Sequence, residues 1–307
     1  MGKVILTENL CKYFKKVKAV DSISISIGKS EIYGFLGLNG AGKTTTIRML
    51  LGMIRPTSGS AYLYGKRVSA GNPELWENVG NLVEIPYSYP DLTVYENLDI
   101  IRRLRSIKNT NEVNKIITKL GLDPYRNIIA KNLSLGNAQR LGLAKALIHN
   151  PQILILDEPA NGLDPAGIVE IREMLQDLAI NKGVTIFISS HILGEIARFA
   201  TRVGIIHEGK LILESGVSEM EKLRKKSLHI RTQNPDATKV LLENKGFNPL
   251  MSIGGSLEIH DTEALLNPEK IAITLVNSGF PPVMLVVEEE DLESFFLRVI
   301  SMNGGIT

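Results

Sequence analysis

Hydrophobic and polar residues recur along the chain with periods that predict its strands and helices. From residue 23 to 27, isoleucine alternates with serine, which predicts a half-exposed antiparallel strand. Three short, largely apolar runs, at 32–36, 153–156 and 185–188, instead have the pattern of strands buried on both faces. The pattern therefore predicts a mixed-sheet α/β core with an antiparallel β part.

Helical spacing replaces the strand pattern between residues 91 and 150. Thr93 and Glu96 have the spacing of a capping box, which marks the start of a helix. Residues 111–120 carry apolar side chains at helical spacing, and Gly121 ends that helix. We expect a helical subdomain, at about residues 85–150, inserted between strands of the sheet.

A basic run at 223–226 marks a predicted domain boundary, which divides the chain into residues 1–225 and 226–307. Beyond it the pattern predicts the order β-α-β-β-α-β, followed by an amphipathic helix that carries Phe295 and Phe296. That order is typical of a ferredoxin-like sandwich. We therefore expect a small accessory α+β domain after the α/β core.

Composition narrows the class of protein. The 307 residues are 44% hydrophobic and 22% charged, as in ordinary folded proteins, and the net charge of +2 gives no argument for nucleic acid. We find no apolar run long enough to span a membrane and no signal-peptide pattern. The single cysteine, Cys11, excludes an internal disulfide. We expect a cytoplasmic protein that reaches a membrane only through a partner chain.

One glycine-rich stretch fits the phosphate-loop pattern of Gly, four residues, Gly, Lys and Thr. Its glycines let the backbone curl, so that N–H groups point at phosphate oxygens. The lysine supplies positive charge, and the hydroxyl that follows can ligate Mg²⁺. An apolar strand precedes the stretch and a helix follows, whose N-terminus favours an anion. The predicted nucleotide-binding residues are Gly37, Leu38, Asn39, Gly40, Ala41, Gly42, Lys43, Thr44 and Thr45.

Two carboxylates and a histidine follow the predicted parallel strands. Asp157 and Glu158 come directly after the run 153–156, and His191 follows the run 185–188. Ligands of parallel α/β sheets bind at the carboxyl ends of the strands. Asp157 is therefore a candidate metal ligand, and Glu158 is a candidate general base toward water.

Together these motifs resemble those of the ATP-binding cassette (ABC) family, over about residues 4–219. Members hydrolyse ATP, mostly to drive membrane transporters. The resemblance implies a P-loop NTPase cassette that binds ATP and Mg²⁺, in which two nucleotide domains sandwich two ATP molecules head to tail. Because the chain has one cassette, its partner would be a second copy or another cassette chain. Integral membrane permease chains would complete the transporter.

The resemblance also implies roles for the residues around the loop. Thr44 and Asp157 would bind Mg²⁺, Glu158 would polarise the attacking water, and His191 would contact the γ-phosphate. Tyr13 would stack on adenine, and the alternative for this residue is a half-buried surface tyrosine.

Other matching residues would act across the dimer. The loop from 161 to Asp164 would communicate between the subunits, and Ser134, Gly136 and Asn137 would close over the ATP of the opposite subunit. Leu135 stands where the family usually has glycine, and Asn137 where glutamine is common. Ser134 and the backbone of Gly136 can still meet a phosphate, so we retain the site.

Glu84 is a second departure, because the family usually has glutamine there. It precedes the segment 86–97, which resembles the transmembrane-coupling region. Glutamate at this place resembles the subgroup linked to bacitracin and lantibiotic self-protection, and we include Glu84 among the candidate metal ligands. The alternative is a near-isosteric change without consequence for the substrate.

The predicted function is the ATP-hydrolysing subunit of an exporter of antimicrobial peptide, drug or lipid-like cargo, held on the inner face of the membrane by permease chains. A soluble relative in DNA repair or translation is the second hypothesis. The chain lacks the sustained heptads of repair proteins and has only one phosphate loop, whereas translation members normally have two. A regulatory module without turnover is the third, and Glu158, the intact candidate base, argues against it.

Overall fold

The computed structural model describes residues 2–69, 71–84, 87–252 and 254–304. The described chain divides into two compact units. One contains the residues up to Val217 and those from Val299 onward, and the other runs from Ser218 to Arg298. No helix in these ranges is both long and apolar enough to cross a bilayer.

A largely parallel sheet, in the order β11-β10-β4-β9-β8-β7, lies at the centre of the first unit. Its neighbouring strands are parallel except at one edge, where β10 and β11 form an antiparallel hairpin. The strands β4, β8 and β9 are buried along their whole length, as their apolar runs predict. The bounds are β4 Ile32–Leu36, β7 Val79–Leu82, β8 Ile153–Asp157, β9 Thr185–Ser190, β10 Arg202–His207 and β11 Lys210–Gly216.

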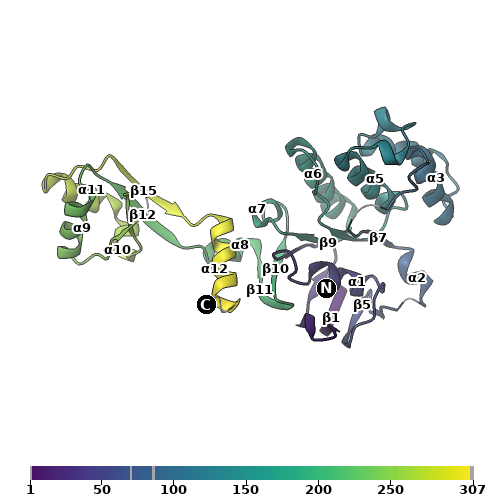
Figure 1. The fold of residues 1–307 in the computed structure, drawn as a ribbon, viewed down its shortest axis with the longest axis horizontal. Coiled ribbons are helices and arrows are strands. Elements are labelled where there is room, and N and C mark those ends of the chain that lie inside the picture. The colour runs from purple at the N-terminus through teal and green to yellow at the C-terminus, as the bar shows by residue number, and fades with distance from the viewer. Residues whose placement is uncertain (1, 70, 85–86, 253, 305–307) are drawn as a thin grey trace. The chain divides into compact units, whose positions relative to one another are not determined.

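An antiparallel sheet, in the order β2-β1-β5-β6 with β3 also paired to β1, faces the parallel sheet (Figure 1). Helix α1 (Lys43–Leu50) packs between the two sheets, and the main hydrophobic core fills this space. The bounds are β1 Lys3–Phe14, β2 Val17–Ile23, β3 Ser26–Gly28, β5 Ser58–Leu63 and β6 Lys66–Arg67. The mixed core with an antiparallel part is therefore confirmed.

The strand expected over residues 23–27 is interrupted, because the side chain of Thr7 makes hydrogen bonds that the backbone of β1 would otherwise make. Thr7 is buried, and its hydroxyl donates to the carbonyl of Ile23 at 3.0 Å. The same oxygen accepts from the amide of Ile25 at 2.9 Å. The chain therefore pairs with β1 as two short strands, β2 and β3.

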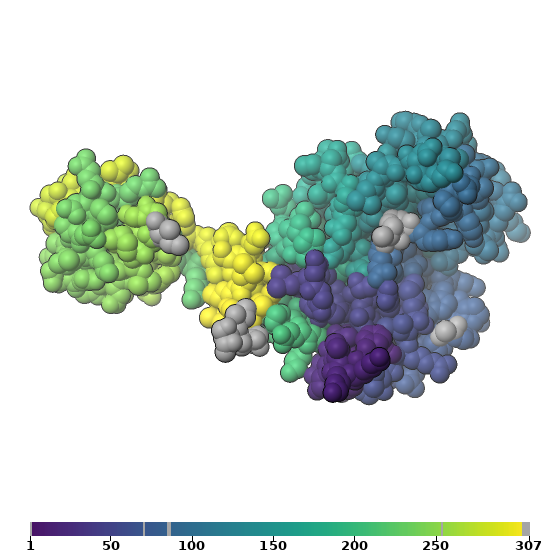
Figure 2. All heavy atoms as spheres, viewed as in Figure 1, coloured from purple at the N-terminus to yellow at the C-terminus, as the bar shows by residue number. Residues whose placement is uncertain are grey.

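The helices of the first unit flank the parallel sheet. Figure 1 shows α6 on the opposite side of this sheet from α1. Helices α3, α4 and α5 form the helical part, which covers one continuous area of the surface in Figure 2. The bounds are α2 Pro73–Trp76, α3 Val94–Leu104, α4 Asn111–Lys119, α5 Leu135–Leu147, α6 Pro165–Lys182 and α7 Leu193–Ile196. Helix α8, Val217–Lys222, has only its first residue in this unit.

The second unit contains an antiparallel sheet in the order β13-β14-β12-β15. Its elements follow the chain order β-α-β-β-α-α-β, so one short helix is added to the expected pattern. Apolar residues of β12, β14, α9, α10 and α11 form its separate core. The bounds are β12 Lys226–Arg231, α9 Pro235–Asn244, β13 Leu250–Met251, β14 Leu257–Ile259, α10 Thr262–Leu266, α11 Pro268–Asn277, β15 Met284–Glu289 and α12 Leu292–Gly304.

Candidate functional site

The predicted phosphate loop joins β4 to α1, and its backbone requires glycine. Gly40 and Gly42 have φ angles of +83° and +109°, which L side chains rarely adopt. A Cβ atom added to Gly42 would lie only 2.3 Å from the carbonyl oxygen of Ala19. Residues 38–40 are exposed, and α1 begins at Lys43. The loop therefore presents backbone N–H groups at a helix N-terminus, as a phosphate site needs.

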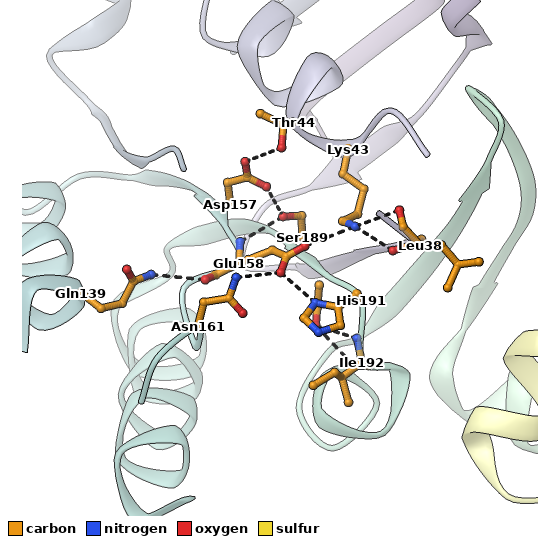
Figure 3. Close-up of polar contacts among 12 residues, drawn as sticks. Leu38, Lys43, Thr44, Gln139, Asp157, Glu158, Asn161, Ser189, His191 and Ile192 are labelled. Carbon is orange, nitrogen blue, oxygen red and sulfur yellow. Dashed lines mark hydrogen bonds and ion pairs between the residues drawn. The ribbon is translucent and has the colours of Figure 1, made fainter. Parts of the chain in front are cut away.

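Lys43 is 6% exposed and folds back over the loop (Figure 3). Its Nζ donates to the carbonyl oxygens of Gly37 at 2.7 Å and Leu38 at 3.3 Å. It also lies 3.2 Å from Oε1 of Glu158. A phosphate bound in the loop would take the place of these oxygens as the partner of the ammonium.

Asp157 and Thr44 meet at the end of β8, where the buried Asp157 accepts two short hydrogen bonds. The hydroxyl of Thr44 donates to its Oδ2 at 2.7 Å, and that of Ser189 donates to Oδ1 at 2.5 Å (Figure 3). A carboxylate beside a hydroxyl, facing the phosphate loop, is an oxygen donor set of the kind that Mg²⁺ prefers. The residues present therefore fit Mg²⁺, which when bound would neutralise phosphate charge.

Glu158 is held by three side chains around its carboxylate. Besides Lys43, Nδ2 of Asn161 donates to Oε2 at 2.8 Å, and Nδ1 of His191 lies 2.8 Å from the same oxygen (Figure 3). Burial alone would raise the pKa of Glu158. The hydrogen bond from Asn161 and the charge of Lys43, together with the contact to His191, outweigh burial and lower this pKa. The carboxylate is thus ionised at neutral pH, as a base must be.

The backbone around Glu158 is fixed by two residues that the sequence analysis did not assign to the site. The amide of Glu158 donates to Oγ of Ser189 at 3.0 Å, and the carbonyl of Glu158 accepts from Nε2 of Gln139 at 3.2 Å. Glu158 has a φ of 45°, so these bonds hold it in the left-handed region. The place of Ser189 at a strand end, two residues before His191, was the available signal for its role.

Ser134, Gly136 and Asn137 lie together at the start of α5. Ser134 is the N-cap residue, and its Oγ accepts from the amide of Asn137 at 3.3 Å. A Cβ atom at Gly136 would lie 2.9 Å from the carbonyl oxygen of Gly162. No hydrogen bond or ion pair joins these three residues to the phosphate loop of the same chain, where all of them are described.

Tyr13 and Asp164 occupy two borders of the site. Tyr13 lies on β1 opposite Lys18 of β2. The next residue, Ala19, has the carbonyl oxygen that a Cβ atom at Gly42 would meet. Its hydroxyl donates to Oδ1 of Asp21 at 3.1 Å. Asp164 is the N-cap of α6 and accepts from the amide of Gly167 at 2.9 Å.

Glu84 makes its ion pair with a residue of α1 and not with the other candidate metal ligands. Its Oε1 is 2.6 Å from Nη2 of Arg48, and its side chain is 53% exposed. No hydrogen bond or ion pair joins Glu84 to Thr44 or Asp157, all of which the structure describes. Arg48 follows Thr44 by one helical turn on α1. The carboxylate of Glu84 therefore lies beside the helical turn after the one that carries Thr44.

Comparison with known proteins identifies the family. The model of the ABC transporter family matches residues 20–161. The bacitracin transport ATP-binding protein BcrA of Bacillus licheniformis is 39% identical, and the match covers 99% of both chains. The lantibiotic transport ATP-binding protein SrtF of Streptococcus pyogenes is 38% identical over 70% of this chain and 92% of its own.

Solved structures agree on the fold. The dimeric ATP-binding cassette MJ0796, in a post-hydrolysis state with ADP and phosphate, has a TM-score of 0.65 and 23% identity. It covers 69% of this chain and 98% of its own. With its phosphate loop, paired carboxylates and cassette fold, the chain belongs to the ABC transporter family, as an ATPase subunit of a transporter.

Proposed function

We propose that this chain hydrolyses ATP for an exporter of antimicrobial peptide, drug or lipid-like cargo. The observation that carries the proposal is the contact of Glu158 with both Lys43 and His191 at the phosphate loop. These groups place a base, a phosphate-binding cation and a hydrogen-bonding imidazole around one point. That arrangement serves the attack of water on a terminal phosphate.

In the proposed mechanism, the residues mainly position ATP and water and stabilise the charge of the transition state, and they form no covalent bond with the phosphate. The loop N–H groups and Lys43 hold the phosphates, and Thr44 and Asp157 would hold Mg²⁺. Glu158 accepts a hydrogen bond from the attacking water and orients it. His191 donates from Nδ1 to Glu158 and, when both ring nitrogens carry a proton, can also donate from Nε2 to the γ-phosphate.

The dimer belongs to the proposal because the site within one chain is incomplete. Ser134 and Asn137 lie at the start of α5 without a polar contact to the phosphate loop of their own chain. We propose that they close over the ATP of a second copy or another cassette chain, placed head to tail, so that two ATP molecules lie at the interface.

The cargo and the membrane partners are proposed from the relatives. Bacitracin transport is named for a relative that matches along its whole length, and lantibiotic transport for another. We propose that permease chains hold this subunit at the inner face of the cell membrane, with no nucleic-acid partner. The second unit supports packing or dimerisation in this proposal.

The substitution Glu158→Gln tests the enzymatic part. The amide keeps the size of the side chain but is a poor base, so turnover should fall by about 10² to 10⁴, the usual contribution of a general base. ATP binding should persist, measured by titration. Glu74→Gln, which changes a carboxylate exposed by 73%, is the matched control and should hydrolyse ATP at the wild-type rate. Equal rates for wild type and Glu158→Gln would exclude Glu158 as the base.

A further inference from the structure

A cavity lies between α6 and α7, next to Glu158. It has a volume of about 610 Å³, which is within the range of small-molecule sites, and it is partly open to solvent. Its apolar lining comes from Ile168, Ile171 and Leu175 of α6, Ile188 of β9, Ile196 of α7, and Phe199. The three side chains of α6 share one face of this helix because their spacing is three and four residues. The cavity is therefore lined mainly by apolar side chains.

The cavity shares one wall with the phosphate site but is separate from it. Glu158, Asn161 and His191 line it, and Figure 3 shows Asn161 and His191 on either side of the Glu158 carboxylate. Lys43, Asp157 and the residues of the phosphate loop do not line it. A molecule in the cavity would thus contact the side chains that hold Glu158 without occupying the place of a phosphate.

Two arginines line the cavity and have no partner in the part of the chain that the structure describes. Arg172 of α6 is half-buried, and Arg198 is exposed. Neither forms a hydrogen bond or an ion pair with a described residue, whereas Arg140 of α5 pairs with Glu170 at 2.8 Å. A half-buried guanidinium has lost part of its hydration. A carboxylate, which offers two oxygens to the five N–H groups of arginine, is the matching group.

We propose that this cavity binds an amphipathic carboxylate, a small molecule with an apolar body and one negative charge. The apolar body packs against Ile171, Leu175 and Phe199, and the carboxylate pairs with Arg172. Arg198 adds to the positive charge of the same cavity. Burial of the apolar body supplies affinity, and the pair with Arg172 selects the charge. Binding here does not depend on the proposed ATP hydrolysis, because none of the groups that hold phosphate takes part.

Decanoate and decanamide test the proposal by calorimetric titration of the full-length chain without nucleotide. The two molecules have the same length, and only decanoate carries a charge. We expect decanoate to bind one site per chain. Decanamide should bind at least about tenfold more weakly, because a charge-assisted pair is lost. Equal affinities would overturn the assignment of the cavity to an anion, and a failure of decanoate to bind would overturn the site itself.

The substitution Arg172→Met removes the charge but keeps an unbranched apolar side chain in the wall. The affinity for decanoate should fall about tenfold, while the affinity for decanamide should stay within about twofold of wild type. Arg231→Met, at an exposed arginine of the second unit, is the matched control and should bind both molecules as wild type does. Undiminished binding of decanoate to Arg172→Met would show that it binds elsewhere and would overturn the inference.

Glu195→Gln should change the affinity in the opposite direction. Glu195 is half-buried and lines the cavity, and it makes no ion pair with Arg172 or Arg198, all three of which the structure describes. Removing its negative charge at nearly constant size should tighten decanoate binding about twofold and leave decanamide binding unchanged. Damage to the fold cannot produce such a gain, so this variant decides the question if Arg172→Met fails to fold. Unchanged or weaker binding of decanoate would contradict the site.

Mg-ADP separates this site from the nucleotide site. The affinity for decanoate should be the same within about twofold with and without saturating Mg-ADP, because the phosphate loop and Lys43 do not line the cavity. Competition between the two would place decanoate in the nucleotide site and overturn the inference. A chain that binds no ADP would refute the proposed function instead, and the titrations with decanoate alone would still test the cavity.

Discussion

At the scale of residues, the phosphate site gives its two carboxylates different partners. Lys43, Glu158 and His191 form a chain of contacts from the loop to the end of β9. Asp157 is kept apart from this chain and bonds to hydroxyls instead. The two neighbouring carboxylates therefore have different surroundings, which suits one to a metal and the other to water.

His149 gives a pH prediction at this scale. Burial lowers its pKa to about 4, and the charge of Arg105 adds to this, against a hydrogen bond with the carbonyl of Val79. The unfolded chain binds a proton below about pH 6.5, whereas the folded chain does not until about pH 4. This contribution to stability is therefore complete above pH 6.5 and is lost as the pH falls toward 4.

The substitution His149→Gln should flatten the dependence of the melting temperature on pH between 6.5 and 4, because glutamine can donate to Val79 without titrating. The measurement is thermal unfolding followed by circular dichroism. His207→Gln, the same change on β10, should leave the dependence as in wild type. An unchanged slope in His149→Gln would show that other groups set the acid sensitivity.

Glu84 gives a second prediction. Because it pairs with Arg48 at half-exposed positions, Glu84→Gln should cost at most about 1 kcal/mol of stability and should keep ATP binding. We expect Glu84→Gln also to shift the Mg²⁺ dependence of ATP hydrolysis, because a carboxylate near the metal adds a negative charge that an amide lacks. Arg48→Gln separates the causes: an equal shift in both variants assigns the effect to the ion pair, and superimposable curves in all three proteins remove any special role for Glu84.

At the scale of elements, helix starts are the best-defined local features of the helical part. The hydroxyl of Thr93 accepts from the amide of Glu96, and Glu96 accepts in return from the amide of Thr93, which forms the predicted capping box. Thr110 precedes α4 in the same kind of position, but its side chain makes no capping hydrogen bond.

Thr93→Ala should therefore lower the free energy of unfolding by about 1 kcal/mol, the usual cost of losing an N-cap. Thr110→Ala is the matched control and should change it by a few tenths of a kcal/mol at most, because no capping bond is lost. Urea unfolding of both variants measures the difference. Equal midpoints would show that packing, and not the cap, fixes the start of α3.

At the scale of the whole molecule, every candidate site residue precedes Val217 and so belongs to the first unit. The second unit has its own sheet and core. Binding of ATP should therefore not depend on it.

Ending the chain after Arg224 should leave ATP affinity within about threefold of wild type, since distant changes usually act independently. The truncation also removes the buried Val299 and Ile300 of the first unit, so solubility and melting temperature should fall. Titration and gel filtration of the truncated protein measure both effects. A folded truncation that has lost ATP binding would contradict the assignment of the site to the first unit.

Features that neighbouring residues impose on one another could be predicted from the sequence. Glycines at fixed spacing gave the phosphate loop, apolar runs gave β4, β8 and β9, and Thr93 with Glu96 gave the start of α3. The C-terminal strands and helices followed the same periodicity, apart from one added short helix. Such features are local because a turn, a cap or a buried strand needs only a few adjacent residues.

Contacts between distant side chains, in contrast, become visible in the folded structure. Glu84 forms an ion pair with Arg48. Ser189 donates a hydrogen bond to Asp157, and Lys145 of α5 donates one to Asn97 of α3. Helix α7 ends at Ile196, and the amide of Thr201 bonds to the carbonyl of Ile32 at the start of β4. These contacts join segments that lie far apart in the chain, and no local pattern records them because they depend on how the sheets and helices pack.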